Sequence, residues 1–267
     1  MPNNDDLWGG LDASDFFSEI GGESLVETPP AAFEKASVAE HRQILDILFL
    51  IDVSGSMRGQ RIAQVNYALE NIFKELRKRD ELNSTIKIGI MEFAETAKWI
   101  TEQPVPLDDY VFTQIAAQPW ITNYGNAFSL LNAKLRREEF LDPRMGEYFA
   151  PLILFVTDGE PVDVTEYPAE LEKLQHNGWF KKSAKYAIAV GEEARNEDIG
   201  RLLSMFTGVR ENVRYADEGE ALCDLIEFIT IRASEVQTSM LSNSSNKEES
   251  NEQSVFSSTD SSLFSSL

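Results

Sequence analysis

The chain has 267 residues, and its hydrophobic fraction of 42% is enough for the core of one large domain or two small ones. The formal net charge of −21 argues against binding to nucleic acid or to anionic membrane surfaces, because both require clustered Lys and Arg. No uncharged apolar run approaches the ~18–20 residues that span a bilayer. The first residues, Met1-Pro2-Asn3-Asn4-Asp5-Asp6, lack the basic and apolar parts of a secretion signal, so we expect a cytoplasmic protein.

Composition divides the chain into three zones. Residues 1–36 contain eight Asp and Glu against one Lys, and Gly and Pro pairs interrupt them, so we expect an acidic, flexible segment. Residues 37–238 alternate apolar runs with helical patterns and are predicted to form one domain. Residues 239–267 are dominated by Ser, Asn and Glu, which predicts a disordered tail.

In the middle zone, apolar runs of strand length alternate with apolar stripes at helical spacing. The predicted strands are 44–52, 86–93, 97–101, 152–156, 184–190 and 213–215. The predicted helices are 60–79, 126–137, 196–206 and 218–234. The short gap before 97–101 indicates a hairpin, and hence an antiparallel edge strand. The whole pattern predicts an α/β fold, with a doubly wound, mostly parallel sheet and helices on both faces.

Three loops of this predicted sheet carry oxygen-bearing side chains. Asp52-Val53-Ser54-Gly55-Ser56 ends the first strand, Asp158 follows the strand 152–156, and Thr122 precedes the helix predicted from Asn126. Because the loops that follow parallel strands share one rim of a sheet, we expect these side chains to lie together. Two carboxylates and three hydroxyls suit a small divalent cation, since hard cations prefer oxygen ligands.

Each segment also has a simpler interpretation. Asp52 followed by Ser-Gly-Ser is typical of a helix N-terminal cap, and so is Thr122-Asn123. The combination with Asp158 favours the metal site. Glu160 and Asp163 are predicted to be charges on the rim and not ligands.

The same residues resemble the von Willebrand factor A (VWA) domain and its metal-ion-dependent adhesion site. The family's motif is Asp-x-Ser-x-Ser, then a Thr in a second loop, then an Asp in a third, usually as Thr-Asp-Gly. Asp52, Ser54 and Ser56 match the first part, and Asp158 matches the third. Thr122 matches the second by position, with Thr113 as the alternative. The resemblance covers roughly residues 44–233 and implies a Rossmann-like fold.

The resemblance implies how such a site would work. The hydroxyls of Ser54, Ser56 and Thr122 would ligate the metal, whereas Asp52 and Asp158 would act through water or exchange with it. Ligand chemistry favours Mg²⁺, with Mn²⁺ and Ca²⁺ as alternatives. In this family an Asp or Glu of a partner protein fills the open position, so the resemblance implies a non-enzymatic, metal-dependent protein-binding module. A carboxylate of the acidic segment 1–36 is a further candidate for that position.

Within the family, Asp-Val-Ser-Gly-Ser-Met without a secretion signal is similar to the intracellular bacterial type. The tellurium-resistance-associated VWA proteins are the narrower resemblance. In that group the VWA protein accompanies a protein phosphatase and a protein kinase. This resemblance implies a kinase or phosphatase as partner, in a bacterial stress or phospho-signalling system.

An enzyme is the main alternative. A Mg²⁺-dependent phosphotransferase or phosphatase of the aspartyl-phosphate type also places an Asp and a metal at a strand end. The haloacid-dehalogenase pattern requires a second Asp two residues after the first, and Ser54 stands at that position. We therefore favour recognition over catalysis.

Overall fold

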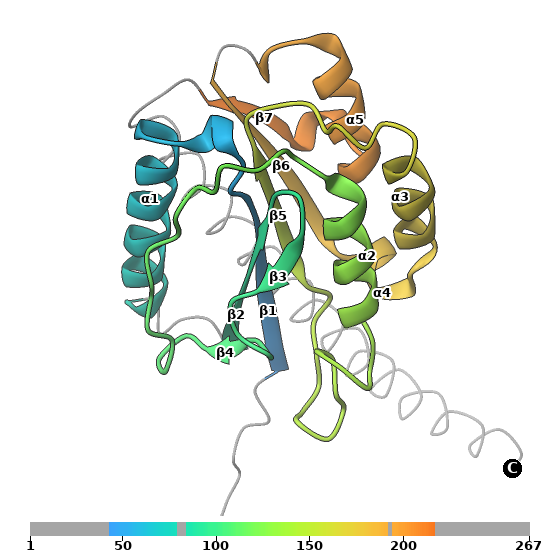
Figure 1. Cartoon of the computed structure of the whole chain (residues 1–267). Coiled ribbons are helices and arrows are strands. Elements are labelled where there is room, and N and C mark those ends of the chain that lie inside the picture. Colours follow the sequence, from blue (N-terminus) through green and yellow to red (C-terminus); the bar gives the residue numbers. More distant parts are fainter. Residues whose placement is uncertain (1–42, 79–83, 192–193, 217–267) are drawn as a thin grey trace, which may run out of the picture. The chain divides into compact units, whose positions relative to one another are not determined.

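A seven-stranded β-sheet forms the centre of the computed structural model, which describes residues 43–78, 84–191 and 194–216 (Figure 1). The strands are β1 (Gln43–Asp52), β2 (Ser84–Phe93), β3 (Ala97–Trp99), β4 (Val105–Pro106), β5 (Leu152–Thr157), β6 (Ala184–Val190) and β7 (Val213–Ala216). The helices are α1 (Gln60–Arg77), α2 (Tyr124–Lys134), α3 (Tyr167–His176), α4 (Gly178–Lys182) and α5 (Glu197–Thr207), with short 3-10 turns η1 (Gly55–Met57) and η3 (Arg210–Asn212).

The sheet is mostly parallel. Its order is β3-β2-β1-β5-β6-β7, and β4 also pairs with β2. The pairs β1–β2, β1–β5, β5–β6 and β6–β7 are parallel, whereas β3 and β4 run antiparallel to β2 at its outer edge. The chain winds outward from β1 to β2 and then returns to the other side of β1 to continue at β5. Ligands bind at such a switch point in open α/β sheets, beyond the carboxyl ends of the strands.

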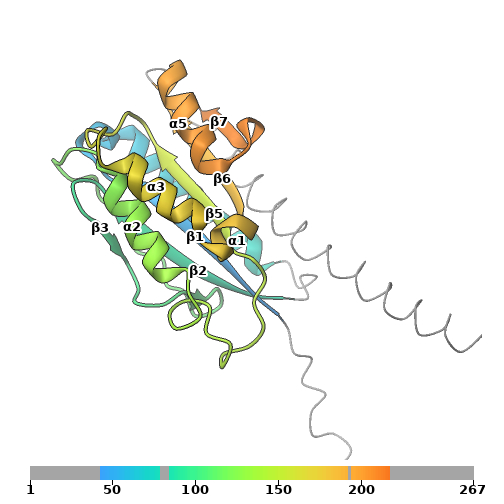
Figure 2. The same cartoon turned by 90° about the vertical axis from the view of Figure 1, so that its right-hand side faces the viewer.

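Helices cover both faces of this sheet. The side chains of Leu45, Ile47 and Phe49 pack in one apolar cluster with those of α1. The alternate side chains of β1, among them Leu48 and Leu50, pack in a second cluster with α2, α3, α4 and α5. Figure 2 shows α2 and α3 side by side over this second face. Since β1 is buried on both faces, its interior positions are apolar except for Asp46, and they do not alternate with polar ones.

Aromatic rings fill the second cluster. Phe155 of β5 stacks on Phe93 of β2 with centroids 4.9 Å apart, and it also contacts Tyr124, Phe128 and Phe206. All five of these side chains are buried. These aromatic rings come from β2, β5, α2 and α5, so they fix how α2 and α5 lie on the sheet. Helix α2 begins directly after the loop that carries one predicted ligand.

The structure confirms the predicted fold class and most predicted elements. All six predicted strands are present within two residues at each end, and the strand at Ala97–Trp99 is antiparallel at the edge. Helix α1 and helix α5 also match their predictions. Helix α2 begins two residues earlier and ends three residues earlier than the predicted range 126–137.

The described elements that are not among the predictions are β4, α3 and α4, together with the short 3-10 turns η1 and η3. Helix α3 buries only Leu171 and Leu174 on its apolar side, so its periodic signal is weak. The predicted helix 218–234, the acidic segment 1–36 and the tail 239–267 lie outside the described residues, so the predicted domain boundaries stay predictions. No helix in the described part of the chain is long and apolar enough to cross a membrane.

Candidate metal centre

Asp52 lies at the end of β1, at the switch point of the sheet, and its side chain is fully buried. The backbone N–H of Ser54 donates to its Oδ1 at 2.8 Å, and the hydroxyl of Thr157 donates to its Oδ2 at 2.7 Å. Thr157 is the last residue of the neighbouring strand β5. Both carboxylate oxygens of Asp52 are therefore held by groups from the two central strands.

A second set of hydrogen bonds connects the two parts of the predicted motif. The hydroxyl oxygens of Ser54 and Ser56 lie 3.0 Å apart, and the Ser56 hydroxyl donates to Asp158 Oδ1 at 2.8 Å. Asp158 directly follows β5, and its side chain is buried. The structure thus brings four of the five predicted ligands into one chain of contacts, across 102 residues of sequence between Ser56 and Asp158.

The predicted fifth ligand, Thr122, lies in the loop that leads into α2. Two backbone hydrogen bonds attach this loop to the first motif, from Gln118 N to Val53 O at 2.6 Å and from Gly55 N to Trp120 O at 2.9 Å. Thr122 itself is buried, and its carbonyl accepts from Val162 N at 2.9 Å. Among the described residues, its hydroxyl makes no hydrogen bond with the other four predicted ligands, so only the hydrogen bonds of its loop bring Thr122 toward them. The alternative, Thr113, is exposed.

Arg61, in the first turn of α1, was not predicted as part of the site. Its Nη1 donates to Asp158 Oδ2 at 2.7 Å, and the side chains of Arg61 and Asp158 are 16% and 0% exposed. The same nitrogen also lies 3.4 Å from the carbonyl oxygen of Ser56. One oxygen of Asp158 therefore faces the Ser hydroxyls while the other is paired with a guanidinium.

Tyr124 and Asp163 hold neighbouring residues of the site in place through hydrogen bonds. The Tyr124 hydroxyl lies 2.9 Å from Thr157 Oγ1 and 2.7 Å from the carbonyl oxygen of Gly159. Asp163 accepts from the backbone N–H of Tyr124 and of Gly125, at 2.9 Å and 2.7 Å. Asp163 is buried, so it stabilises the N-terminus of α2 and is not the rim charge that the sequence predicted.

Burial sets the electrostatics of this centre. It raises the pKa of Asp52 to about 6, although hydrogen bonds from Ser54 and Thr157 oppose the shift. Burial also raises the pKa of Tyr124 well above its ordinary value, and the negative charge of Asp52 adds to that. A cation beside Asp52 would relieve this cost, because it would favour the ionised carboxylate.

The donors at this centre fit a hard divalent cation. Asp52 and Asp158 supply carboxylate oxygens, and Ser54 and Ser56 supply hydroxyl oxygens that already lie within contact of one another. In the described part of the chain, no three His, Cys, Asp or Glu side chains cluster to hold a metal. A metal at this centre would therefore depend on hydroxyl and water ligands as well as carboxylates. Such a ligand set suits Mg²⁺ better than a soft metal that prefers thiolate ligands.

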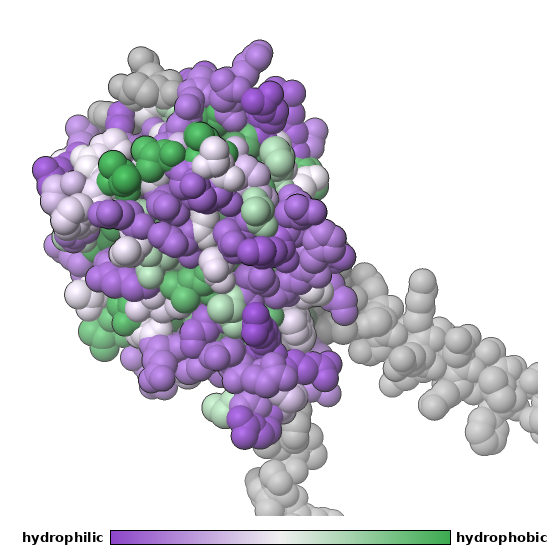
Figure 3. Space-filling model, turned by 45° about the vertical axis from the view of Figure 1, so that its right-hand side comes forward, coloured by the Kyte–Doolittle hydropathy of each residue, from purple (hydrophilic) through white to green (hydrophobic). Residues whose placement is uncertain are grey.

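Exposed apolar side chains flank the centre. Trp120 and Ile121 precede Thr122 and are 52% and 55% exposed, and Val162 and Val164 follow Asp158 and are 53% and 62% exposed. The hydrogen bond between Val162 N and Thr122 O joins the two loops. In Figure 3, a group of apolar side chains lies in the upper part of the molecule, below a hydrophilic top edge, and β1 and β5 end toward this upper part in Figure 1. We refer to Trp120, Ile121, Val162 and Val164 as the apolar rim.

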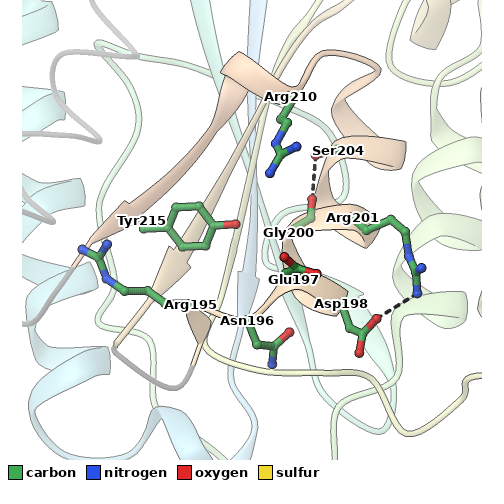
Figure 4. A pocket seen from close by; sticks show the side chains of 9 residues that line it. All are labelled: Arg195, Asn196, Glu197, Asp198, Gly200, Arg201, Ser204, Arg210 and Tyr215. Carbon is green, nitrogen blue, oxygen red and sulfur yellow. Dashed lines mark hydrogen bonds and ion pairs between the residues drawn. The ribbon is translucent and has the colours of Figure 1, made fainter.

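A pocket of about 610 Å³ lies farther along the same side of the sheet, between α5 and β7 (Figure 4). Figure 4 shows Tyr215 pointing toward Gly200, and a Cβ at Gly200 would lie 2.4 Å from the Tyr215 hydroxyl. Its charged lining carries both signs and consists of Arg195, Arg201, Arg210, Glu197 and Asp198. Asn196, which also lines it, donates to Glu160 at 3.0 Å, so the pocket adjoins the loop that carries Asp158.

Solved structures share this fold. The pilus adhesin SpaC from Lactobacillus rhamnosus GG aligns with a TM-score of 0.53 at 13% identity, over 73% of this chain and 30% of that one. Proximal thread matrix protein 1 from the mussel byssus, in a structure with a zinc-occupied MIDAS motif, aligns with a TM-score of 0.51 at 17% identity, over 73% of this chain and 46% of that one. At these identities the likeness concerns the fold.

Several known proteins are also similar to this chain in sequence. Inter-alpha-trypsin inhibitor heavy chain H4 of Sus scrofa is 30% identical over 180 residues, which are 66% of this chain and 19% of that protein. The chain thus matches about a fifth of the length of this relative. The further relatives are also inter-alpha-trypsin inhibitor heavy chains, so the narrower similarity to tellurium-resistance-associated proteins is not supported. The von Willebrand factor type A domain family matches residues 46–264, and the chain belongs to this family.

Proposed function

We propose that this chain is a metal-dependent protein-binding module. Mg²⁺, with Mn²⁺ or Ca²⁺ as alternatives, would be held by Asp52, Ser54, Ser56, Thr122 and Asp158. A carboxylate from a partner protein would complete the coordination. The observation that carries this proposal is the convergence of Ser54, Ser56 and Asp158 in one hydrogen-bonded chain beside Asp52, at the switch point of the sheet. The zinc-occupied MIDAS motif of the mussel protein supports it by analogy.

The charge of the proposed ligands favours recognition. Asp52 and Asp158 are the two carboxylates among them, so a divalent cation would keep enough positive character to attract a third carboxylate. The apolar rim would add contact area around that point, since exposed apolar groups beside a polar centre are typical of protein interfaces. The pocket of Figure 4 would extend the surface past Glu160.

The phosphotransferase alternative has less support. Ser54 stands where an acid/base Asp would be needed, and Asp52 accepts hydrogen bonds at both oxygens. Hydrolysis of p-nitrophenyl phosphate with Mg²⁺, abolished by Asp52→Asn, would favour that alternative over ours. A kinase or phosphatase as partner, a role in bacterial stress signalling and a cytoplasmic location stay predictions.

Manganese provides the direct test. Mn²⁺ binding is measured by electron paramagnetic resonance, and water-proton relaxation reports whether the bound ion keeps exchangeable water. We expect wild type to bind Mn²⁺ with open positions, and Mg²⁺ to compete. Asp158→Ala and Ser54→Ala should each weaken Mn²⁺ binding by at least about tenfold. The first removes a proposed carboxylate ligand, and the second removes a proposed hydroxyl ligand together with its contact to Ser56.

Asp108→Asn is the matched control, because Asp108 is an exposed carboxylate outside the site. It should bind Mn²⁺ as wild type does. Equal binding by wild type and Asp158→Ala would refute the proposed site. A wild-type protein that binds no divalent cation at all would refute the metal-dependent mechanism and leave the fold untouched.

A further inference from the structure

In the ion pair between Arg61 and Asp158, the acidic partner is itself a proposed metal ligand. Asp158 is fully buried at its side chain, and Arg61 is 16% exposed, so water screens this pair only in part. The 2.7 Å contact uses Oδ2 of Asp158, whereas Oδ1 accepts from the Ser56 hydroxyl at 2.8 Å. The guanidinium can therefore stay paired with Oδ2 of Asp158 while Oδ1 faces the proposed metal.

This pairing changes the charge that a metal would meet. Asp52 and Asp158 alone would offer two negative charges, and Arg61 cancels one of them. With a divalent cation bound, the centre would then be more positive by one charge than it would be without Arg61. The extra charge has two opposite consequences, since it repels the metal and attracts an incoming carboxylate.

The pairing also fixes Asp158 when no metal is present. A buried carboxylate without a partner is costly, and both oxygens of Asp158 have partners here. Arg61 lies in the first turn of a long helix, α1, whose buried face is anchored on the sheet. Its charge is thus held in place by the fold and not by the ligand.

We propose that Arg61 is a built-in counter-charge that weakens metal binding and strengthens binding of the partner's carboxylate. This inference rests on the proposed function above. It assigns a specificity-determining role to a residue that does not ligate the metal. Arg61 makes the centre depend on a partner, because the metal is held less tightly until a carboxylate neutralises the excess charge.

The decisive variant is Arg61→Gln, which removes the charge and keeps hydrogen-bonding capacity. A guanidinium that shares the Asp158 carboxylate with a divalent cation repels that cation, because the two positive charges would lie within a few ångströms in a partly buried site. We therefore expect Arg61→Gln to bind Mn²⁺ about tenfold more tightly than wild type. Acetate, titrated into the manganese-loaded protein against chloride at constant ionic strength, should bind more weakly to the variant.

Two controls separate this role from a structural one. Arg61→Lys keeps the charge and should stay near wild type in both measurements. Arg58→Gln removes an exposed arginine from the preceding turn and should change neither. Without metal, Arg61→Gln should melt at a lower temperature than wild type, and saturating Mg²⁺ should raise its melting temperature by more.

The opposite signs make the inference refutable. Damage to the fold would lower both affinities, whereas the counter-charge predicts tighter metal and weaker acetate. An Arg61→Gln protein that is folded and binds Mn²⁺ as wild type does, or more weakly, would overturn the inference. Failure of the proposed function looks different, because wild type itself would then bind no metal.

Discussion

Asp46 should make the stability of this protein depend on pH far from the metal centre. It lies near the start of β1 with its side chain fully buried, and neither carboxylate oxygen has a hydrogen-bond partner among the described residues. Lys87 is its neighbour on β2, and the Lys87 amine contacts the Tyr148 hydroxyl at 3.4 Å. Burial raises the pKa of Asp46 to about 7, and the charge of Lys87 only partly opposes this.

The sign follows from the direction of the shift. The pKa of Asp46 is raised from 3.8 to about 7, so the folded state binds the proton more tightly than the unfolded state does. The stability that this contributes is fully present below pH 3.8 and is lost as the pH rises through about 7. The difference between a pKa of 3.8 and one of about 7 corresponds to about 4 kcal/mol over the whole range, and to about 2 kcal/mol between pH 5.5 and pH 8.

Urea unfolding of wild type and Asp46→Asn, both with EDTA, measures this directly. Both pH values lie above the isoelectric point of about 4.5, which favours solubility. The free energy of unfolding of wild type, relative to the variant, should fall by about 2 kcal/mol from pH 5.5 to pH 8. Asp108→Asn, at an exposed carboxylate, should follow wild type at both values. If wild type and Asp46→Asn instead run parallel over this range, the reasoning from burial is wrong.

Three other substitutions test the packing around the site, each read by urea unfolding against a matched control. Gly125→Ala should cost about 1–3 kcal/mol, because an added Cβ would lie 2.8 Å from Asp163 Oδ2; Gly178→Ala, where nothing lies within 4 Å, should be near neutral, and equal costs would contradict this. Tyr124→Phe should cost about 1–2 kcal/mol, since its buried hydroxyl contacts Thr157 and Gly159; Tyr67→Phe, at a ring that is 61% exposed, should cost nothing measurable. Phe206→Ala should cost about 3–5 kcal/mol because it leaves a cavity among Phe128, Phe155 and Phe180; a loss no larger than that of the exposed Met205→Ala would refute this account of the core.

The fold was predictable because its central strands are buried on both faces. β5 is a continuous apolar run and β1 is interrupted inside the strand by Asp46 alone, and such runs between turn signals indicate parallel strands. The position of the candidate site follows from the same reasoning, since Asp52 and Asp158 come directly after these two strands. Four predicted ligands thus lie together because the topology places the ends of neighbouring strands side by side.

The supporting residues were not predictable in the same way. Arg61 is 97 residues from Asp158, and Tyr124 is 33 residues from Thr157. Arg, Tyr and Asp are common on any helix or loop, so nothing local separates these from surface residues. Asp163 illustrates this, because its type suggested a rim charge and only the fold shows that it stabilises the start of α2. Helix α3 has Pro168 in its first turn, where proline is well tolerated, but its two buried Leu give little periodicity.

Asp52 is held by a neutral hydroxyl and Asp158 by a charged guanidinium. Removing these two partners should change the affinity for a metal in opposite directions. Thr157, held in turn by Tyr124, orients Asp52 and adds no charge, so its loss would leave the carboxylate free to move away from a cation. Arg61 orients Asp158 as well, but it adds a full charge. Near a divalent cation the charge outweighs the orientation, because Coulomb repulsion at partly buried sites exceeds the value of one hydrogen bond. We therefore expect Tyr124→Phe to weaken metal binding and Arg61→Gln to tighten it.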